Sequence, residues 1–369
     1  MKNLKQLREA SKYRIILTGG GTGGSVTPLL AIADELVDQY STELSLLWIG
    51  TTQGVERSMV ATYPLAYRAI LSAKWRRYFS IFNITDLFNL VIGFFQSLII
   101  LSIFKPQLII TAGSFVSVPV VWAAWLLGVR VLVHQQDIRP GLANKLMAPI
   151  AKIITVSFEK SLLDYKKKSI WVGNPVRKEF KQYLSVARPN VSQAGQLPGV
   201  LVLGGGTGSE SINNLVLSSL NELVKICKLV HITGKHTAVP LLNREKVANY
   251  YFYDLLDAEN FARALSEADL VITRAGLGTL SEIAFLAKPA IIIPMPKSHQ
   301  EDNAKYFGDC KAAVVLDQEK LTPEDFVKAL SDLLANHDLM SKMSEAMKNS
   351  MKRNANAGLT HIIDRLLNS

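Results

Sequence analysis

The chain has 369 residues, of which 49% are hydrophobic and 8% aromatic. This is enough for two ordinary domains with real cores, and it excludes a disordered chain. The two cysteines, Cys227 and Cys310, lie far apart and fit no metal-ligand spacing, so we expect a reducing cytoplasm rather than a disulfide framework. The formal net charge of +10 favours phosphorylated substrates or an anionic membrane surface as partners. Because no basic stretch belongs to a recognisable nucleic-acid motif, we expect no nucleic-acid partner.

The first half of the chain alternates between strand-like and helix-like runs. After an N-terminal segment too polar for a signal peptide, an apolar run at 14–20 leads through a glycine-rich turn into a helix. We expect that helix over 28–40, with Thr27 as its N-cap and Pro28 in its first turn. Later runs are continuously apolar, as buried parallel strands are, at 44–50, 106–114, 129–137 and 151–158. The alternation predicts a doubly wound α/β domain.

Residues 87–104, LFNLVIGFFQSLIILSIF, form one nearly continuous apolar run at the lower length limit for spanning a bilayer. Three interpretations are open: a buried helix that crosses between two parallel strands, a helix that rests on a membrane surface, and a true span. We expect the buried helix, because polar residues dilute the run and a strand-like run follows at once. The surface helix is supported by basic and aromatic residues just upstream. The candidates for membrane contact are Trp75, Arg76, Arg77, Phe94 and Phe95.

The second half repeats the same organisation after a polar stretch at 178–198, which we expect to be a linker. Its strands are predicted over 199–206, 228–234, 269–276 and 289–296, and its helices over 212–226, 258–268 and 278–287. The sequence therefore predicts two similar α/β domains, 1–178 and 199–344, with the crevice between them as the default ligand site. The segment 345–369 is expected to be a C-terminal helix that packs back on the first domain.

Each half opens with a glycine-rich turn between a strand and a helix, TGGGTGG at 18–24 and LGGGTGS at 203–209. Such a turn lets backbone N–H groups approach an anion, and the following helix adds its positive end. The first turn also fits the dinucleotide pattern, but the second strand ends at Gly50 and Thr51 without the acidic residue that would hold a ribose. Neither turn continues as a P-loop. Phosphate-binding loops are therefore favoured over tight turns without a ligand.

A second group of polar residues follows the strand at 269–276. Arg274 and two glycines lead into a helix that carries Glu282, whose carboxylate can accept both hydroxyls of a ribose while the helix N-terminus faces a diphosphate. The alternative is an ordinary helical glutamate. Downstream, His299, Gln300 and Asn303 are candidates for orienting a sugar, and the alternative there is a polar surface loop.

In this order the motifs resemble one family, the MurG-type N-acetylglucosaminyltransferases of peptidoglycan synthesis, which have a two-domain GT-B architecture. The matching stretches cover nearly the whole chain and are TGGGTGGSVTPLLAIADEL from 18, GSFVSVP from 113, VHQQDIRPGLANK from 133, VGNPVR from 172, LGGGTGS from 203, TRAGLGTLSE from 273 and HQEDNA from 299. The resemblance implies two Rossmann-like domains with an interdomain cleft.

The resemblance also implies the reaction, an inverting transfer of N-acetylglucosamine from UDP-N-acetylglucosamine (UDP-GlcNAc) to the muramyl sugar of undecaprenyl-diphospho-muramoyl peptide, which converts lipid I to lipid II. The implied partners are these two substrates, anionic lipids of the inner leaflet and cell-wall synthesis proteins, with no cofactor. The implied location is peripheral, on the cytoplasmic face of the cell membrane. Alternatives are another GT-B sugar-nucleotide enzyme, such as a glycolipid transferase or a UDP-GlcNAc 2-epimerase, and a non-catalytic UDP-sugar-binding protein.

The family's functional residues are carried over by position. The residues that would bind the donor are Arg177, Gly206, Thr207, Arg274, Leu277, Gly278, Thr279, Glu282, His299, Gln300 and Asn303. The residues that would bind the acceptor or its diphosphate are Thr22, Gly23, Gly24 and Asn144.

The chain departs from the family's usual pattern where the chemistry would take place. Ser25 replaces the histidine usual after the first glycine turn, His134-Gln135-Gln136-Asp137 replaces His-Glu-Gln-Asn, and Phe115 replaces a tyrosine. Since the reaction needs a base and Ser25 cannot act unaided, we expect Asp137 to take the proton, with His134, a substrate phosphate or water as alternatives. Loop amides, the helix end and Arg274 would stabilise the leaving UDP, so no metal ion is expected.

Overall fold

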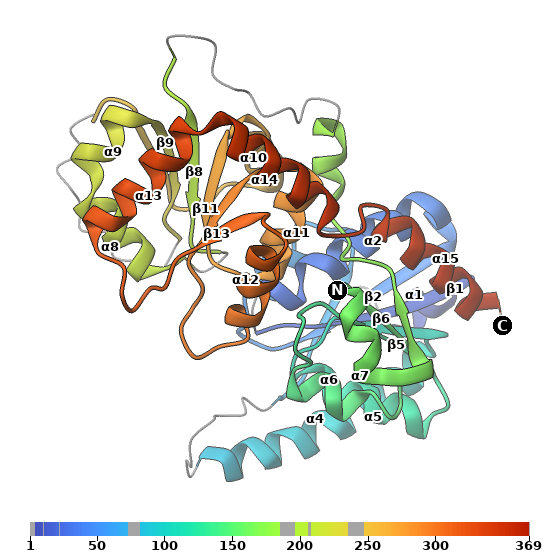
Figure 1. The fold of residues 1–369 in the computed structure, drawn as a ribbon. Helices are drawn as coiled ribbons and strands as arrows, with labels where there is room; N and C mark the ends of the chain where they lie inside the picture. Colours follow the sequence, from blue (N-terminus) through green and yellow to red (C-terminus); the bar gives the residue numbers. More distant parts are fainter. Residues whose placement is uncertain are drawn as a thin grey trace. The chain divides into compact units, whose positions relative to one another are not determined.

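The computed structural model describes residues 4–9, 11–21, 23–72, 82–184, 196–205, 208–234 and 247–368, apart from the side chains of 82–87 and 166. It divides the chain into two compact units (Figure 1). The first unit combines residues 1–177 with the C-terminal residues 352–369, and the second consists of residues 178–351.

The first unit is built on a seven-stranded sheet in which every neighbouring pair is parallel, in the order β3-β2-β1-β4-β5-β6-β7. Its inner strands are apolar at consecutive positions because helices cover both faces of the sheet. The strands are β1 (Tyr13–Thr18), β2 (Leu44–Gly50), β3 (Ala66–Ala69), β4 (Leu108–Thr111), β5 (Arg130–Gln135), β6 (Ile153–Val156) and β7 (Ser169–Trp171).

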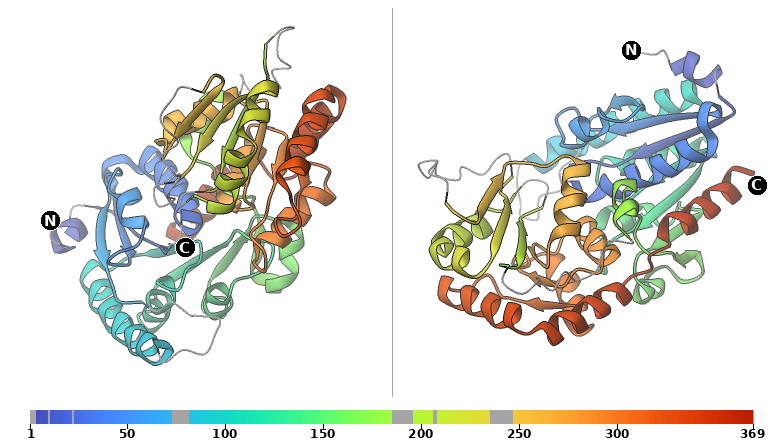
Figure 2. Two further views of the ribbon diagram at one scale, coloured as in Figure 1. Left: turned by 90° about the vertical axis from the view of Figure 1, so that its left-hand side faces the viewer. Right: turned by 90° about the horizontal axis from the view of Figure 1, so that it is seen from above.

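Two helical layers enclose this sheet, α4 and α5 on one face and α2 and α15 on the other (Figure 2). Ile16 contributes to the core beneath α4 and α5, and its neighbours Ile15 and Leu17 contribute to the core beneath α2 and α15, as the alternation of side chains along a strand requires. The helices are α1 (Leu4–Glu9), α2 (Thr27–Tyr40), α3 (Glu56–Val60), α4 (Phe82–Phe104), α5 (Ser117–Leu126), α6 (Leu142–Met147), α7 (Leu162–Tyr165) and α15 (Ala355–Asn368), with 3-10 turns η1 (Gly23–Ser25), η2 (Ser41–Glu43), η3 (Glu159–Ser161) and η4 (Lys166–Lys168).

The second unit repeats the plan with a six-stranded parallel sheet in the order β10-β9-β8-β11-β12-β13. Its strands are β8 (Gly199–Leu203), β9 (Lys228–Ile232), β10 (Tyr250–Tyr253), β11 (Leu270–Thr273), β12 (Ala290–Ile292) and β13 (Ala313–Val315). Its helices are α8 (Glu210–Ser218), α9 (Leu220–Ile226), α10 (Ala258–Glu267), α11 (Leu277–Phe285), α12 (Gln300–Asp309), α13 (Pro323–Ala335) and α14 (His337–Asn349), with the 3-10 turn η5 (Lys178–Tyr183).

In both sheets the strand order reverses beside the first strand of the unit. β1 lies between β2 and β4, and β8 lies between β9 and β11, so the chain leaves each first strand in one direction and later returns to its other side. The carboxyl ends of the strands at such a switch point form the usual ligand site of a doubly wound sheet. Both glycine-rich turns leave the sheet there, one after β1 and one after β8.

Helix α4 is buried on one side only, so the expectation of a buried crossing helix is wrong for its other side. Leu101 and Phe104 belong to the core of the first unit, whereas Phe95 is 57% and Ile99 is 61% exposed. Helix α5 packs beside α4 and α6 packs beside α5 (Figure 1), and both helices also carry exposed apolar side chains. We call the exposed apolar residues of these three helices the apolar face; they are Phe88, Val91, Ile92, Phe95, Ile99, Trp122, Trp125, Leu126, Leu142 and Leu146. Across the described ranges, no helix has the length and hydropathy of a membrane span.

Several local expectations needed correction. Val26, not Thr27, is the N-cap of α2; the Thr27 hydroxyl instead donates to the Gly23 carbonyl, and Pro28 does lie in the first turn. The helix expected over 212–226 is interrupted at Ser219, which caps α8 and precedes α9. The C-terminal segment 345–369 contains the end of α14 and the separate helix α15, which contacts α2.

Candidate functional site

The first glycine-rich turn is held together by Ser25. The N–H of Gly20 donates to Ser25 Oγ at 3.2 Å, and the same hydroxyl donates to the Gly20 carbonyl at 3.1 Å. Ser25 is buried, so its side chain closes the turn from the inside. Gly21 adopts φ +81°, which favours glycine. Gly23 is half-exposed and Gly24 exposed directly before α2, where the positive end of the helix favours an anion.

A buried carboxylate, that of Glu56, contacts the same turn. Its Oε2 accepts the N–H of Gly21 at 3.0 Å, and its Oε1 accepts the N–H and the hydroxyl of Thr51 at 2.7 and 2.5 Å. The side chain is fully buried, and a Cβ added at Gly20 would lie 2.5 Å from the carboxylate. Glu56 therefore shapes the turn, and the sequence analysis missed it. The available signal was an acidic residue after Gly54, in the segment that follows β2.

The loops after β4 and β5 adjoin this turn, because β1, β4 and β5 are consecutive in the sheet. The Ser117 hydroxyl lies 3.0 Å from the carbonyl oxygens of both Thr18 and Gly113, so it ties the ends of β1 and β4 together. Gly113 has φ +97°, and a Cβ there would lie 2.9 Å from Asn144 Oδ1. The close approach of α6 to this loop thus depends on a glycine.

Asp137, the expected base, lies in the loop after β5 and is half-exposed. Its main-chain carbonyl accepts a hydrogen bond from Gln135 Nε2 at 2.6 Å. Gln135 is 1% exposed, and its Oε1 accepts from Asn144 Nδ2 at 2.5 Å and from the Tyr165 hydroxyl at 3.1 Å. Asn144 Oδ1 is buried without a hydrogen-bond partner in the described part of the chain.

His134, the alternative base, is fully buried between β5 and β6. Its Nε2 lies 2.8 Å from Asn174 Oδ1 and its Nδ1 lies 3.0 Å from Thr155 Oγ1, so both ring nitrogens have protein partners. Burial lowers its pKa to about 4 despite the hydrogen bond to Asn174 Oδ1, which favours the protonated ring. These contacts are those of a structural histidine that joins β5, β6 and the segment after β7.

The second glycine-rich turn is supported by Arg274, at the end of β11. The guanidinium is 7% exposed and donates to Ser209 Oγ at 3.0 Å and Ser211 Oγ at 2.5 Å. It also donates to the carbonyls of Ile293 and Pro294 at 2.9 and 3.0 Å. Burial lowers the pKa of Arg274 from its ordinary value. Arg274 was expected to meet the diphosphate itself, but here its donors hold the protein groups around the loop.

The residues around Arg274 set the start of α8. Ser209 is the N-cap of α8 and accepts the N–H of Ile212. Gly208 has φ +80°, and a Cβ at this position would lie 2.2 Å from the Thr233 carbonyl oxygen. Position 208 therefore requires glycine. Arg274 therefore fixes the N-terminus of α8 against the ends of β11 and β12.

Helix α11 carries the remaining predicted donor residues. Gly278 and Thr279 are half-exposed in its first turn, whereas Leu277 and Glu282 are each 3% exposed. The segment 299–304, expected to be a loop whether or not it binds a sugar, is mostly helical, since α12 begins at Gln300. His299 is exposed at its N-cap, Gln300 Oε1 accepts the N–H of Met295, and the fully buried Asn303 donates to the Ala275 carbonyl at 3.1 Å.

Comparisons with known proteins show which family the chain belongs to. The glycosyltransferase family 28 N-terminal domain matches residues 15–156, and the glycosyltransferase family 28 C-terminal domain matches residues 199–358. A Clostridium kluyveri protein named UDP-N-acetylglucosamine--N-acetylmuramyl-(pentapeptide) pyrophosphoryl-undecaprenol N-acetylglucosamine transferase is 36% identical, over 89% of this chain and 94% of its own length. A Clostridium tetani protein of the same name is 35% identical over 96% of this chain and 97% of its own length. The chain belongs to the MurG family.

Solved structures support the MurG fold. The crystal structure of Acinetobacter baumannii MurG matches with a TM-score of 0.73 and 23% identity, over 96% of this chain and 99% of that one. A Neisseria meningitidis UDP-GlcNAc 2-epimerase bound to UDP-GlcNAc matches with a TM-score of 0.67 and 14% identity, over 95% and 100%. At these identities the likeness shows the fold alone, and it confirms the predicted GT-B architecture.

Several predicted residues lie outside the described residues. They are Thr22, Gly206 and Thr207 of the substrate sites and Trp75, Arg76 and Arg77 of the expected membrane contact. Arg177 is half-exposed and is the last residue of the first unit before the division. Phe94 is partly buried against the core, and Phe95 lies on the apolar face. Among the described side chains, no cluster of three or more His, Cys, Asp or Glu residues could hold a metal ion.

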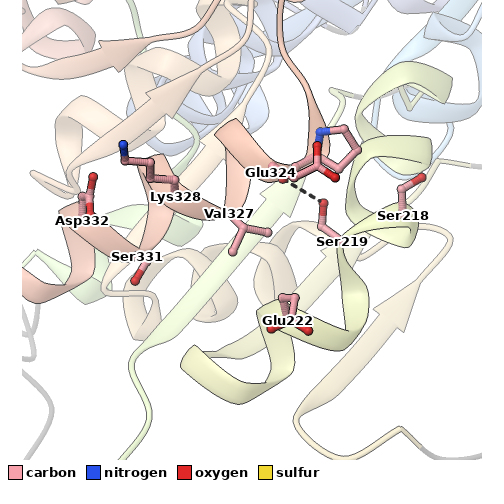
Figure 3. Close-up of a pocket in the computed structure, with 9 residues that line it drawn as sticks. Ser218, Ser219, Glu222, Glu324, Val327, Lys328, Ser331 and Asp332 are labelled. Carbon is pink, nitrogen blue, oxygen red and sulfur yellow. Dashed lines mark hydrogen bonds between the residues drawn. The ribbon is translucent and has the colours of Figure 1, made fainter.

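An open groove of about 430 Å³ in the second unit is separate from the residues of the MurG site (Figure 3). It lies between the junction of α8 with α9 and helix α13, and the Ser219 hydroxyl contacts the Pro323 carbonyl at its edge. Its lining residues are Ser218, Ser219, Glu222, Pro323, Glu324, Val327, Lys328, Ser331 and Asp332. None of them belongs to a glycine-rich turn, so we assign this groove no part in the reaction.

Proposed function

We propose that this member of the MurG family transfers N-acetylglucosamine from UDP-GlcNAc to the muramyl sugar of undecaprenyl-diphospho-muramoyl peptide. The observation that carries the proposal is that a chain of this family has one glycine-rich turn at the switch point of each sheet. The reaction has two diphosphate-bearing substrates, one for each turn.

The donor binds the second unit. The N-terminal turn of α11, with the amides of Leu277, Gly278 and Thr279, faces the nucleotide and its diphosphate, because an N-terminal helix end stabilises negative charge. Glu282 accepts the ribose hydroxyls, and Gln300 orients the sugar. Arg274 acts indirectly, since its four described hydrogen bonds go to protein groups that shape the loop.

The acceptor binds the first unit. Its diphosphate contacts the amides of Gly23 and Gly24, because Ser25 and Glu56 already accept the N–H groups of Gly20 and Gly21.

Asp137 is the base of the reaction. The acceptor hydroxyl oxygen attacks the anomeric carbon while the bond from that carbon to the UDP oxygen breaks, and the hydroxyl proton passes to the Asp137 carboxylate. The departing UDP keeps the bonding electrons, and loop amides and the end of α11 stabilise its charge. Ser25 closes the first turn and His134 joins two strands, so neither competes for the proton-transfer role.

The apolar face binds the cytoplasmic surface of the membrane without spanning it. Phe88, Phe95, Ile99 and Trp125 are each more than half exposed on α4 and α5, and water is an unfavourable environment for exposed apolar side chains. A lipid surface that also holds the undecaprenyl tail of the acceptor would cover these side chains. The basic residues at 74–77 lie outside the described residues, and they would add attraction to anionic lipids.

Replacing Asp137 by Asn tests the chemical assignment. The carboxamide keeps the size of the side chain but cannot take the proton, so the rate of transfer should fall about 100-fold or more while UDP-GlcNAc binds as before. Replacement by Glu should retain part of the activity. Full turnover in the Asn variant would remove Asp137 from the role, and loss of nucleotide binding would point to structural damage instead.

A further inference from the structure

Ser211, in the first turn of α8, joins the end of the second glycine-rich turn to the loop after β13. Its Oγ lies 2.5 Å from Arg274 Nη2 and 2.9 Å from Gln318 Oε1, which is 107 residues further along the chain. A guanidinium nitrogen can only donate, so Ser211 accepts from Arg274 and its own hydrogen goes to Gln318. The hydrogen bonds therefore run in one direction, from Arg274 through Ser211 to Gln318.

Ser209, the last residue of the glycine-rich turn, completes this network. Its Oγ accepts from Arg274 Nε at 3.0 Å and from the N–H of Ile212 at 3.4 Å, and it lies 3.2 Å from Ser211 Oγ. Because Ser211 gives its hydrogen to Gln318, the Ser209 hydroxyl is the donor between the two serines. The direction of both hydroxyl groups thus depends on an acceptor at position 318.

Gln318 is held in place by the turn that contains it. The Asp317 carboxylate accepts the N–H of Glu319 at 3.0 Å, and the Asp317 carbonyl accepts the N–H of Lys320 at 3.1 Å. The Gln318 side chain is half-buried. It therefore offers its oxygen to Ser211 from a fixed place beyond the carboxyl end of β13.

The start of α8 is held from two sides. Ser211 joins it to the loop after β13, and Asn213 joins it to the end of β9 by donating to the Thr233 carbonyl at 3.0 Å. In the sheet β9 lies on one side of β8, and β11, β12 and β13 lie on the other. The place of the glycine-rich turn after β8 is consequently set by strand ends on both of its sides.

We propose that Ser211 and Gln318 are positioning residues for the donor diphosphate. The proposal rests on the proposed function, which assigns one diphosphate-bearing substrate to each glycine-rich turn. Gln318 orients the hydroxyl of Ser211, Ser211 holds the guanidinium of Arg274, and the turn keeps the geometry that a diphosphate needs. The two residues act through Arg274 and the start of α8, so a ligand without phosphate does not depend on them.

Replacing Ser211 by Ala removes the link, and calorimetry with UDP measures the consequence. UDP should bind about five-fold more weakly, the effect of one lost hydrogen bond. The affinity for uridine, measured by its competition with UDP, should stay within about two-fold of native, whereas general damage to the second unit would weaken both ligands. Ser211→Thr keeps the hydroxyl and should restore UDP binding. Ser218→Ala, at an exposed position on the same helix, is the matched control.

Replacing Gln318 by Leu tests the far end of the network. It removes the acceptor and leaves Ser211 and Arg274 in place, so UDP should bind about three-fold more weakly. Combined with Ser211→Ala, it should add no further loss, because both changes break the same chain of hydrogen bonds.

Native UDP affinity in Ser211→Ala, equal losses for UDP and uridine, or losses that add in the double variant would each overturn the proposal. None of these measurements requires transfer. A native protein that binds UDP but does not glycosylate a short-chain lipid I analogue would therefore refute the proposed function alone, and a native protein that binds no UDP would refute both.

Discussion

Glu56 Oε2 accepts the backbone N–H of Gly21 at 3.0 Å, across 35 residues of sequence. The first glycine-rich turn therefore contains an anion supplied by the protein itself, fully buried and surrounded by neutral donors from the turn and from Thr51. A substrate phosphate cannot use the same N–H group. The acceptor diphosphate is consequently directed to the amides of Gly23 and Gly24, next to α2.

Glu56→Gln should weaken both the fold and the acceptor site. The amide matches the carboxylate in size, but its NH2 end must face the N–H of either Gly21 or Thr51, so at least one contact becomes donor against donor. We expect the free energy of unfolding to fall by about 2 kcal/mol and the KM for the acceptor to rise, with UDP binding unaffected. Chemical denaturation and steady-state kinetics measure the two effects. The control Glu222→Gln, in an exposed pair with Lys225, should change stability by less than about 0.5 kcal/mol.

Arg274→Lys should impair donor binding without removing positive charge. A lysine cannot reproduce the planar set of donors that joins Ser209, Ser211 and the carbonyls after β12. The N-terminus of α8 then loses its support, and we expect UDP to bind about ten-fold more weakly by calorimetry. Arg263→Lys, at an exposed position on α10, serves as the matched control. Native affinity in the Arg274 variant would show that the charge alone suffices.

Phe95→Glu should release the protein from lipid. Phe95 is 57% exposed on the apolar face, and burying such a ring contributes about 1.5–3 kcal/mol, so binding to anionic vesicles should fall at least about ten-fold. Transfer to a soluble short-chain acceptor should be unchanged. Leu339→Glu places the same charge on α14, where Leu339 is 41% exposed, and should leave vesicle binding intact. Equal vesicle sedimentation by all three proteins would contradict a membrane role for the apolar face.

Stability should fall in mild acid because of two buried histidines. Burial lowers the pKa values of His134 and His231 to about 4, below the unfolded value near 6.5, so the unfolded chain takes up protons first as pH decreases. The contribution of the two neutral histidines to the free energy of unfolding is fully present above about pH 6.5 and is lost toward pH 4. By pH 5.5 the loss is about 1 kcal/mol or more per histidine. Denaturant titrations across this range measure it, and His231→Asn should reduce the dependence. A flat stability profile between these pH values would contradict the assignment.

The parallel strands at the centre of each sheet were predictable because they are apolar at consecutive positions. The positions of the glycine-rich turns followed from them, since one turn comes directly after β1 and the other directly after β8. The strands that the sequence analysis missed are β3, β7, β10 and β13, the outermost strands of the two sheets. An edge strand has one open side and fewer buried positions; β10, for example, is exposed at three of its four residues. Its sequence therefore lacks the apolar run that identifies a central strand.

The partners of the site residues were harder to predict than their positions. Arg274 was expected at the end of a strand, before the helix that carries Glu282, but nothing in the sequence indicates that Ser209 and Ser211 accept its hydrogen bonds. Glu56 was missed because its contact with Gly21 arises only when the segment after β2 folds against the turn after β1. Hydropathy identified α4, yet it cannot distinguish a side covered by protein from a side that is exposed, as Phe95 is.

The central claim is the transfer itself, and one measurement tests it most directly: passage of radiolabel from UDP-GlcNAc to a short-chain lipid I analogue in the presence of EDTA. We predict labelled disaccharide product at a rate that EDTA does not change, with the label lost from the nucleotide and gained by the acceptor in equal amounts. Tight binding of UDP without any labelled product would contradict the transferase assignment for this acceptor. If EDTA abolishes product formation, the assignment of the reaction stands, but the expectation that no metal ion takes part is overturned.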